Sequence, residues 1–134
     1  MDCVFCKIVS GEIKSKFLKE TVHSVSFLDA FPLTSGHTLV IPKNHHQKIQ
    51  DLSVEENNDL FSLVHLMISK VDTVTGSTLV AIHNGHDAGQ EIPHVHVHLV
   101  PRSKKDSAGP IHSMFDPVHL SESEMSDLYN KLKI

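Results

Sequence analysis

The clearest hydrophobic pattern lies in the middle of the chain, between Ser53 and Gly76. Apolar residues recur there at intervals of three and four, which is typical of one face of an α-helix. These residues are Leu60, Leu63, Val64, Met67, Ile68 and Val71. Ser53 and Glu56 form a capping box at the start, and Gly76 suits the end. The pattern predicts a long helix whose apolar face covers a sheet.

Shorter helical patterns lie near both ends of the chain. The first covers residues 3–10 and stops before Gly11, while the second starts at a capping box of Ser121 and Glu124. Their apolar faces are Phe5, Ile8 and Val9 in the first and Met125, Leu128 and Leu132 in the second. We therefore expect a short helix before the sheet and a tail helix after it.

Strand patterns occupy the segments between these helices. Residues 22–29 and 37–41 are rich in β-branched and apolar side chains, and the turn-prone residues between them predict a β-hairpin. Residues 77–83 and 95–100 form a second pair of strands around a turn-rich segment. The order of elements predicts one α+β domain over residues 1–134, with a mostly antiparallel sheet and the long helix packed on it.

Composition narrows the class of protein. The chain has 134 residues and a formal net charge of -4, without the basic stripe that binding to a long nucleic acid requires. It lacks both an apolar run of the roughly 20 residues that span a bilayer and a signal-like apolar core. These features predict a cytoplasmic protein without membrane or long nucleic-acid partners. The two cysteines, Cys3 and Cys6, have a spacing that suits metal or redox chemistry.

Histidine is unusually abundant, and three copies alternate at His94, His96 and His98. Alternate side chains of a strand share a face, so we expect these imidazoles on one face and the intervening apolar residues in the core. Three histidines spread over roughly 13 Å of one strand cannot easily close around one metal. The row is better suited to catalysis, with the central imidazole as the nucleophile.

The segment from Gly89 to Arg102 resembles the signature of the histidine-triad family. The similarity extends upstream through Cys3 to Ile8, Phe27 and Asp29, and the segment 36–43, and so covers roughly residues 3–102. The resemblance implies a histidine-triad fold and a homodimer that cleaves purine nucleotides at the α-phosphate through a nucleotidyl-histidine.

The resemblance also implies roles for individual residues. His96 corresponds to the nucleophile, His98 to the residue at the phosphate and leaving group, and His94 to the residue whose carbonyl orients His96. His37 corresponds to a fourth histidine beside the phosphate, and Asp29 to the carboxylate that binds the ribose hydroxyls. The candidate substrate-binding residues are Phe5, Ile8 and Phe27 in the base pocket, with His83, Asn84 and Gln90 beyond it.

Glu91 departs from the family pattern. It occupies the position at which the phosphoramidase branch has serine and the fragile-histidine-triad branch has threonine. An acid there could repel phosphate or point elsewhere, so Glu91 is not included among the predicted site residues.

A metal site is the second expectation from the resemblance. In similar bacterial members, the cysteine pair is completed by histidines that correspond to His45 and His94, with His46 as the rival of His45. A Cys₂His₂ set gives a closed tetrahedral zinc site, which is structural rather than catalytic.

Three functions are compatible with the sequence. The leading one is hydrolysis of an adenosine nucleotide, either a dinucleoside polyphosphate or a phosphoramidate. Pro101 and Arg102 resemble the dinucleotide-hydrolysing branch. Nucleotidyl transfer would use the same intermediate, whereas a non-catalytic nucleotide sensor or scaffold would not need the nucleophile His96.

Overall fold

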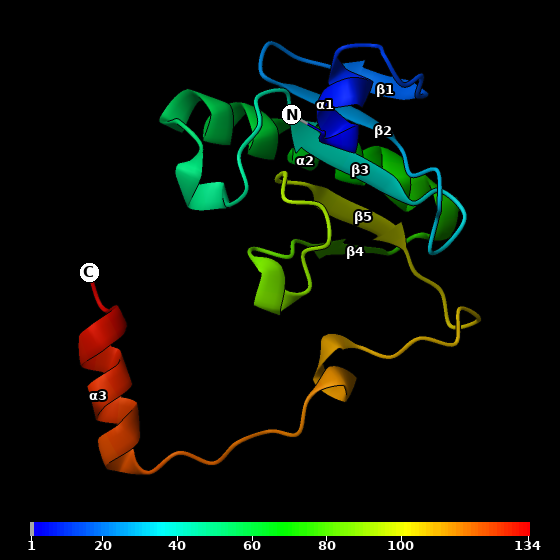
Figure 1. Cartoon of the computed structure of the whole chain (residues 1–134). Coiled ribbons are helices and arrows are strands. Elements are labelled where there is room, and N and C mark those ends of the chain that lie inside the picture. The colour runs from blue at the N-terminus through cyan, green and yellow to red at the C-terminus, as the bar shows by residue number, and fades with distance from the viewer. Residues whose placement is uncertain (1) are drawn as a thin grey trace.

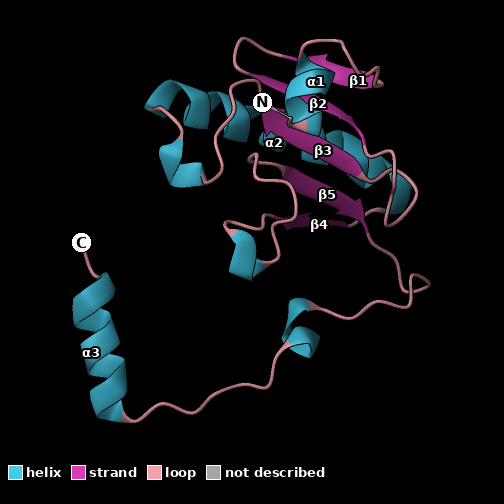
Figure 2. Cartoon of the chain, in the orientation of Figure 1, coloured by secondary structure: helices cyan, strands magenta, loops and turns pink. Residues whose placement is uncertain are grey.

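A computed structural model describes residues 2–134 and shows a five-stranded antiparallel sheet with a helix on each face (Figures 1 and 2). The strands are β1 (Phe17–Glu20), β2 (Ser24–Leu28), β3 (Thr38–Pro42), β4 (Thr78–Ala81) and β5 (Val97–Pro101). The α-helices are α1 (Val4–Val9), α2 (Val54–Thr75) and α3 (Glu122–Leu132), and the 3₁₀ helices are η1 (Ile49–Asp51), η2 (His86–Ala88) and η3 (Ile111–Met114). The spatial order of strands is β1-β2-β3-β5-β4. The predicted α+β class is confirmed.

The long helix α2 has the ends that its sequence predicts. The Ser53 side chain accepts from the Glu56 N–H, and the Glu56 side chain accepts from the Ser53 N–H. Gly76 terminates the helix with φ of 92°, a left-handed conformation that glycine adopts without steric cost. The predicted apolar face packs against the sheet, with Leu60 and Leu63 almost fully buried.

Alternation along the strands gives the sheet two buried faces. One face packs on α2 through a core that includes Val40, Val97 and Leu99. The opposite face packs on α1 through Val25, Phe27, Leu39, Ile41, Phe5 and Ile8. Because side chains alternate, His96 and His98 lie on the α1 side while the residues between and beyond them enter the α2 core.

The structure differs from the predicted elements at two places. Strand β1 was not predicted, because its four residues are all exposed and show no alternation of apolar and polar side chains. It forms the edge of the sheet beside β2. Strand β5 begins at Val97, so His94 and His96 lie in the irregular segment just before the strand.

The tail helix α3 lies far from the body of the domain (Figure 1). Every residue from 107 to 134 is exposed, including Met125, Leu128, Tyr129 and Leu132 on its apolar side. Its capping box forms as predicted, between Ser121 and Glu124. Within residues 2–134, no helix combines the length and apolar composition needed to cross a bilayer.

Candidate active site

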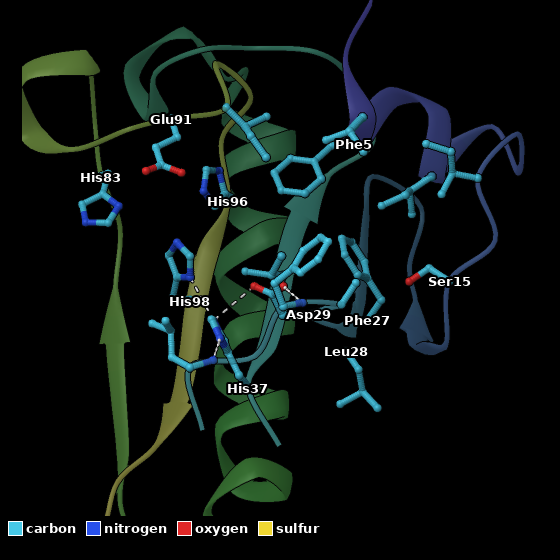
Figure 3. A pocket seen from close by; sticks show the side chains of 18 of the residues that line it. Phe5, Ser15, Phe27, Leu28, Asp29, His37, His83, Glu91, His96 and His98 are labelled. Atoms are coloured by element: carbon cyan, nitrogen blue, oxygen red, sulfur yellow. Dashed lines mark hydrogen bonds and ion pairs between the residues drawn. The ribbon is translucent and has the colours of Figure 1, made fainter. Parts of the chain in front are cut away.

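A cavity of about 510 Å³ opens beside α1 and the ends of β2, β3 and β5 (Figure 3). Its walls include eight of the predicted site residues, together with Glu91 and Ile92. The eight are Phe5, Ile8, Phe27, Asp29, His37, His83, His96 and His98. Segments far apart in the chain therefore meet at one pocket, with an apolar side at α1 and a histidine-rich side at β5.

His96 has one ring nitrogen fixed and one directed toward the cavity. Its Nδ1 lies 2.7 Å from the carbonyl oxygen of His94, and a carbonyl can only accept, so Nδ1 carries the proton. The Nε2 lone pair is then available for attack on an electrophile in the pocket. Phe5 packs edge-on against the ring, with centroids 5.0 Å apart. Backbone geometry thus fixes the tautomer that a nucleophile needs.

A second hydrogen-bonded chain sets the tautomers of His37 and His98. The Leu33 N–H donates to Nδ1 of His37 at 3.0 Å, so that nitrogen is unprotonated and Nε2 carries the proton. Nε2 of His37 in turn donates to Nδ1 of His98 at 3.0 Å. His98 therefore keeps its proton on Nε2, as a donor for a group bound in the cavity.

Burial keeps these imidazoles neutral. Desolvation lowers the pKa of His98 to about 4, and the neighbouring rings of His96 and His37 add to the effect. Burial also lowers the pKa values of His96 and His37, with Asp29 acting in the opposite direction on both. His96 and His98 consequently offer the cavity one imidazole lone pair and one imidazole N–H.

Asp29 lies at the end of β2, where the strand enters the turn toward β3. Its Oδ1 accepts from the Phe31 N–H at 2.8 Å, and its Oδ2 lies 3.6 Å from Nε2 of His37. The carboxylate borders the cavity beside Phe27 (Figure 3). Its two oxygens could accept from a pair of vicinal hydroxyls.

Of the three remaining candidates for substrate contact, only His83 lines the cavity. The Asn84 side chain accepts from the Ile49 N–H and donates to Gln50, which joins two loops. Gln90 is 4% exposed and donates to the Gln47 carbonyl oxygen while accepting from the Gly85 N–H. The structure thus places Asn84 and Gln90 in loop hydrogen bonds outside the pocket wall.

Glu91, which the sequence reasoning left out, does line the cavity. Its carboxylate points toward the space beside His83 and His96 (Figure 3). The signal that could have found it was its place in the signature itself, immediately before Ile92. Arg102, by contrast, is held by Asp106 and by the carbonyl oxygens of residues 108 and 109. Arg102 therefore organises the start of the tail.

The predicted metal ligands Cys3, Cys6, His45 and His94 converge behind the nucleophile. Their candidate ligand atoms lie within 4.8 Å of one another. Nδ1 of His94 lies 3.5 Å and 3.7 Å from the two sulfurs, and Nδ1 of His45 lies 3.4 Å from the Cys6 sulfur. Ordinary tetrahedral zinc bonds place sulfur and nitrogen ligands about 3.6 Å apart, so this set fits zinc.

Hydrogen bonds distinguish the predicted metal ligands from the other histidines and acids nearby. Nε2 of His94 donates to the Pro42 carbonyl oxygen at 2.8 Å, which leaves Nδ1 as the lone-pair nitrogen facing the sulfurs. His46 instead faces the buried carboxylate of Glu56, at 3.1 Å. A second cluster of Asp29, His37 and His98 fits a metal poorly, because the tautomers above put a proton on Nε2 of His37.

The family model for the HIT domain matches residues 10–105. The chain belongs to the HIT, or histidine-triad, family. It is 40% identical over 106 residues to an adenosine 5′-monophosphoramidase of Schizosaccharomyces pombe, covering 79% of this chain and 78% of the relative.

Two solved structures of HIT-family proteins extend this comparison. The protein from Bacillus subtilis is 28% identical and superposes with a TM-score of 0.87, covering 98% of this chain and 95% of that one. A zinc-bound histidine-triad protein from Mycobacterium smegmatis is 36% identical with a TM-score of 0.68, covering 80% of this chain and 79% of the other.

Proposed function

We propose that this HIT-family chain hydrolyses adenosine nucleotides at the α-phosphate through a covalent adenylyl group on Nε2 of His96. The observation that carries the proposal is the 2.7 Å contact between Nδ1 of His96 and the His94 carbonyl oxygen. It leaves Nε2 unprotonated beside the cavity, where Asp29 and the apolar wall would hold ribose and base. The similarity to a monophosphoramidase supports the choice of substrate.

The first step forms a bond between Nε2 of His96 and the α-phosphorus. The bond from phosphorus to the leaving group breaks, its electron pair leaves with that group, and an amine leaving group takes up one solvent proton. The Nε2–H of His98 donates to the group at phosphorus, and the His94 carbonyl stabilises the positive charge that develops on His96. Water then attacks phosphorus, AMP leaves His96, and one proton returns to solvent.

Rapid-quench mass spectrometry with adenosine 5′-phosphoramidate tests this proposal. We expect the chain to gain the mass of one adenylyl group within the first turnover, and to lose it as AMP appears. His96→Asn should form no adduct and should lower kcat by several orders of magnitude, because a covalent nucleophile cannot be replaced. His65→Asn, at an exposed histidine on α2, is the matched control. Normal turnover by His96→Asn would refute the assignment.

We also propose that Cys3, Cys6, His45 and His94 hold a structural zinc ion. The fit of donor types and distances supports this, as does the zinc-bound relative. When bound, the ion would supply a cross-link between α1 and the segment that carries His96. It would thereby fix Phe5 and Ile8 relative to the nucleophile.

A homodimer is the third element of the proposal. The apolar side of α3 is exposed in the single chain, which favours burial against a second copy. The body, up to residue 102, is about three quarters of the chain, so it could not alone give a TM-score of 0.87 over 98% of the residues. The outlying tail therefore has a comparable position in a solved relative. Light scattering should give twice the 14.9 kDa chain mass; a monomer at micromolar concentration would contradict this.

A further inference from the structure

The acidic side chain of Glu91 occupies the histidine side of the cavity. Glu91 is exposed, lines the cavity wall, and makes no hydrogen bond or ion pair from its carboxylate to any of residues 2–134. Figure 3 shows the carboxylate directed toward the space beside His83 and His96. The adenine and ribose candidates lie across the cavity, so this carboxylate is on the side where a leaving group would depart.

No lysine or arginine within residues 2–134 forms an ion pair with this carboxylate. Lys14 is the only lysine or arginine among the described residues that line the cavity. Its neighbour Ser15 lies on the opposite side of the cavity from Glu91 (Figure 3). Nδ1 of His37 accepts from the Leu33 N–H, so this ring carries no charge. A group departing past Glu91 therefore meets a carboxylate that has no ion-pair partner among residues 2–134.

The backbone on both sides of Glu91 is anchored. Gln90 is bonded to two loops through its buried amide, and Ile92 packs against the core beneath α1. The Ile92 carbonyl oxygen also accepts from the His94 N–H at 2.8 Å. These contacts hold the Cα of Glu91 at the rim while the side chain extends over the cavity.

We propose that Glu91 selects the leaving group, favouring adenosine phosphoramidates with a cationic amine over dinucleoside polyphosphates. This inference rests on the proposed function and specifies its substrate class. The leaving nitrogen takes up a solvent proton before the P–N bond breaks, which makes it positively charged, and it then departs with the bonding electron pair as a neutral amine. A nearby carboxylate stabilises the protonated nitrogen before it departs. A polyphosphate leaving group carries several negative charges, which the same carboxylate repels.

Three substrates separate these effects. The first is AMP joined through nitrogen to the ε-amine of lysine amide, which keeps a free ammonium group. The second is the same compound with that group acetylated, and the third is diadenosine tetraphosphate. We expect wild-type kcat/KM to favour the first over the second by about 1.5-fold to fivefold, the range for one solvent-exposed charge pair.

Glu91→Gln keeps the shape of the side chain and removes its charge. It should abolish the preference for the cationic over the acetylated amine and should raise kcat/KM for the tetraphosphate by about threefold to tenfold. Asp87→Asn, at an exposed acid in the neighbouring turn, is the matched control and should change neither ratio. Because the Glu91 carboxylate makes no hydrogen bond or ion pair within residues 2–134, the melting temperature should stay unchanged and so exclude a folding defect.

Equal ratios in wild type and Glu91→Gln would overturn the role of Glu91. That result is distinguishable from failure of the proposed function, which the acetylated substrate reports by itself. If the wild type cleaves the acetylated amine and His96→Asn does not, adenylyl transfer stands whatever Glu91 does. If neither protein cleaves any of the three compounds, the proposed function fails.

Discussion

Replacing His37 with phenylalanine tests whether the chain from Leu33 through His37 to His98 controls the reaction. His37 is 2% exposed, and its Nε2 lies 3.0 Å from Nδ1 of His98. Phenylalanine keeps an aromatic ring of similar size but has no donor. Nδ1 of His98 would then lack its partner, and the proton of His98 would no longer be directed to the nitrogen that faces the cavity.

The expected loss follows from the cost of an unsatisfied polar group. Leaving a buried acceptor without its donor costs about 1–3 kcal/mol. Because about 1.4 kcal/mol corresponds to a tenfold change in rate, kcat should fall about fivefold to a hundredfold. The fall should appear in kcat for a phosphoramidate, with less effect on KM, because base and ribose contacts lie elsewhere in the cavity.

His37→Gln is the matched variant. A glutamine amide can accept from the Leu33 N–H through its oxygen and donate to His98 through its nitrogen, so it should recover much of the lost rate. Nitrogen NMR of the His98 ring gives an independent measurement, with Nε2–H in the wild type and a mixture of tautomers in His37→Phe. Unchanged kcat and unchanged tautomer in His37→Phe, in a protein that melts normally, would refute the reasoning.

Three further outcomes test the other parts of the site. Cys6→Ser should reduce the amount of bound zinc and lower the melting temperature. A strong chelator should have the same two effects on the wild type. Wild-type protein that contains far less than one zinc per chain would contradict the zinc site. Asp29→Asn should weaken AMP binding in a titration by roughly tenfold to a hundredfold, but should leave a 2′,3′-dideoxy analogue unaffected; equal losses for both would make Asp29 structural. Burial lowers the pKa of His98 to about 4, so the unfolded chain binds more protons between that value and the ordinary histidine pKa near 6.5. This histidine's contribution to stability should therefore diminish as pH falls through that range, and kcat/KM should decline toward pH 4; a rate that rises on acidification would show that His98 acts protonated.

The periodicity of hydrophobic residues in the sequence was sufficient to predict the main helices and strands. The capping box at Ser53 and the left-handed Gly76 mark the ends of α2, and the predicted hairpin appears as the antiparallel pair of β2 and β3. The edge strand β1 was missed because strand pairing creates it: its side chains stay exposed on both faces, so no hydrophobic pattern encodes it. The tail is a helix by local sequence and capping box, but its apolar side stays exposed in the single chain, so burial of that side does not explain its position.

The sequence was sufficient to predict which residue types form the site, but it predicted less well where their side chains point. The alternating histidines indicated one face, and the structure places His96 and His98 at one cavity. Asn84 and Gln90 lie in the same turn-rich segment as His83 in sequence, but their side-chain amides form hydrogen bonds with neighbouring loops. Such pairings depend on backbone groups from residues about 35 to 45 positions away, and no local pattern reports them.

His94 shows why position in a row of histidines does not determine its chemistry. Its carbonyl oxygen holds Nδ1 of His96, its Nε2 is bonded to the Pro42 carbonyl, and its Nδ1 faces the sulfurs of Cys3 and Cys6. The ring is fully buried, and desolvation lowers its pKa to about 4, which leaves Nδ1 unprotonated as a metal ligand requires. One residue thus connects the cysteine cluster to the nucleophile through its own backbone. A change that moves the His94 ring must also move the carbonyl that orients His96, so we expect loss of the metal site to lower the rate as well as the stability.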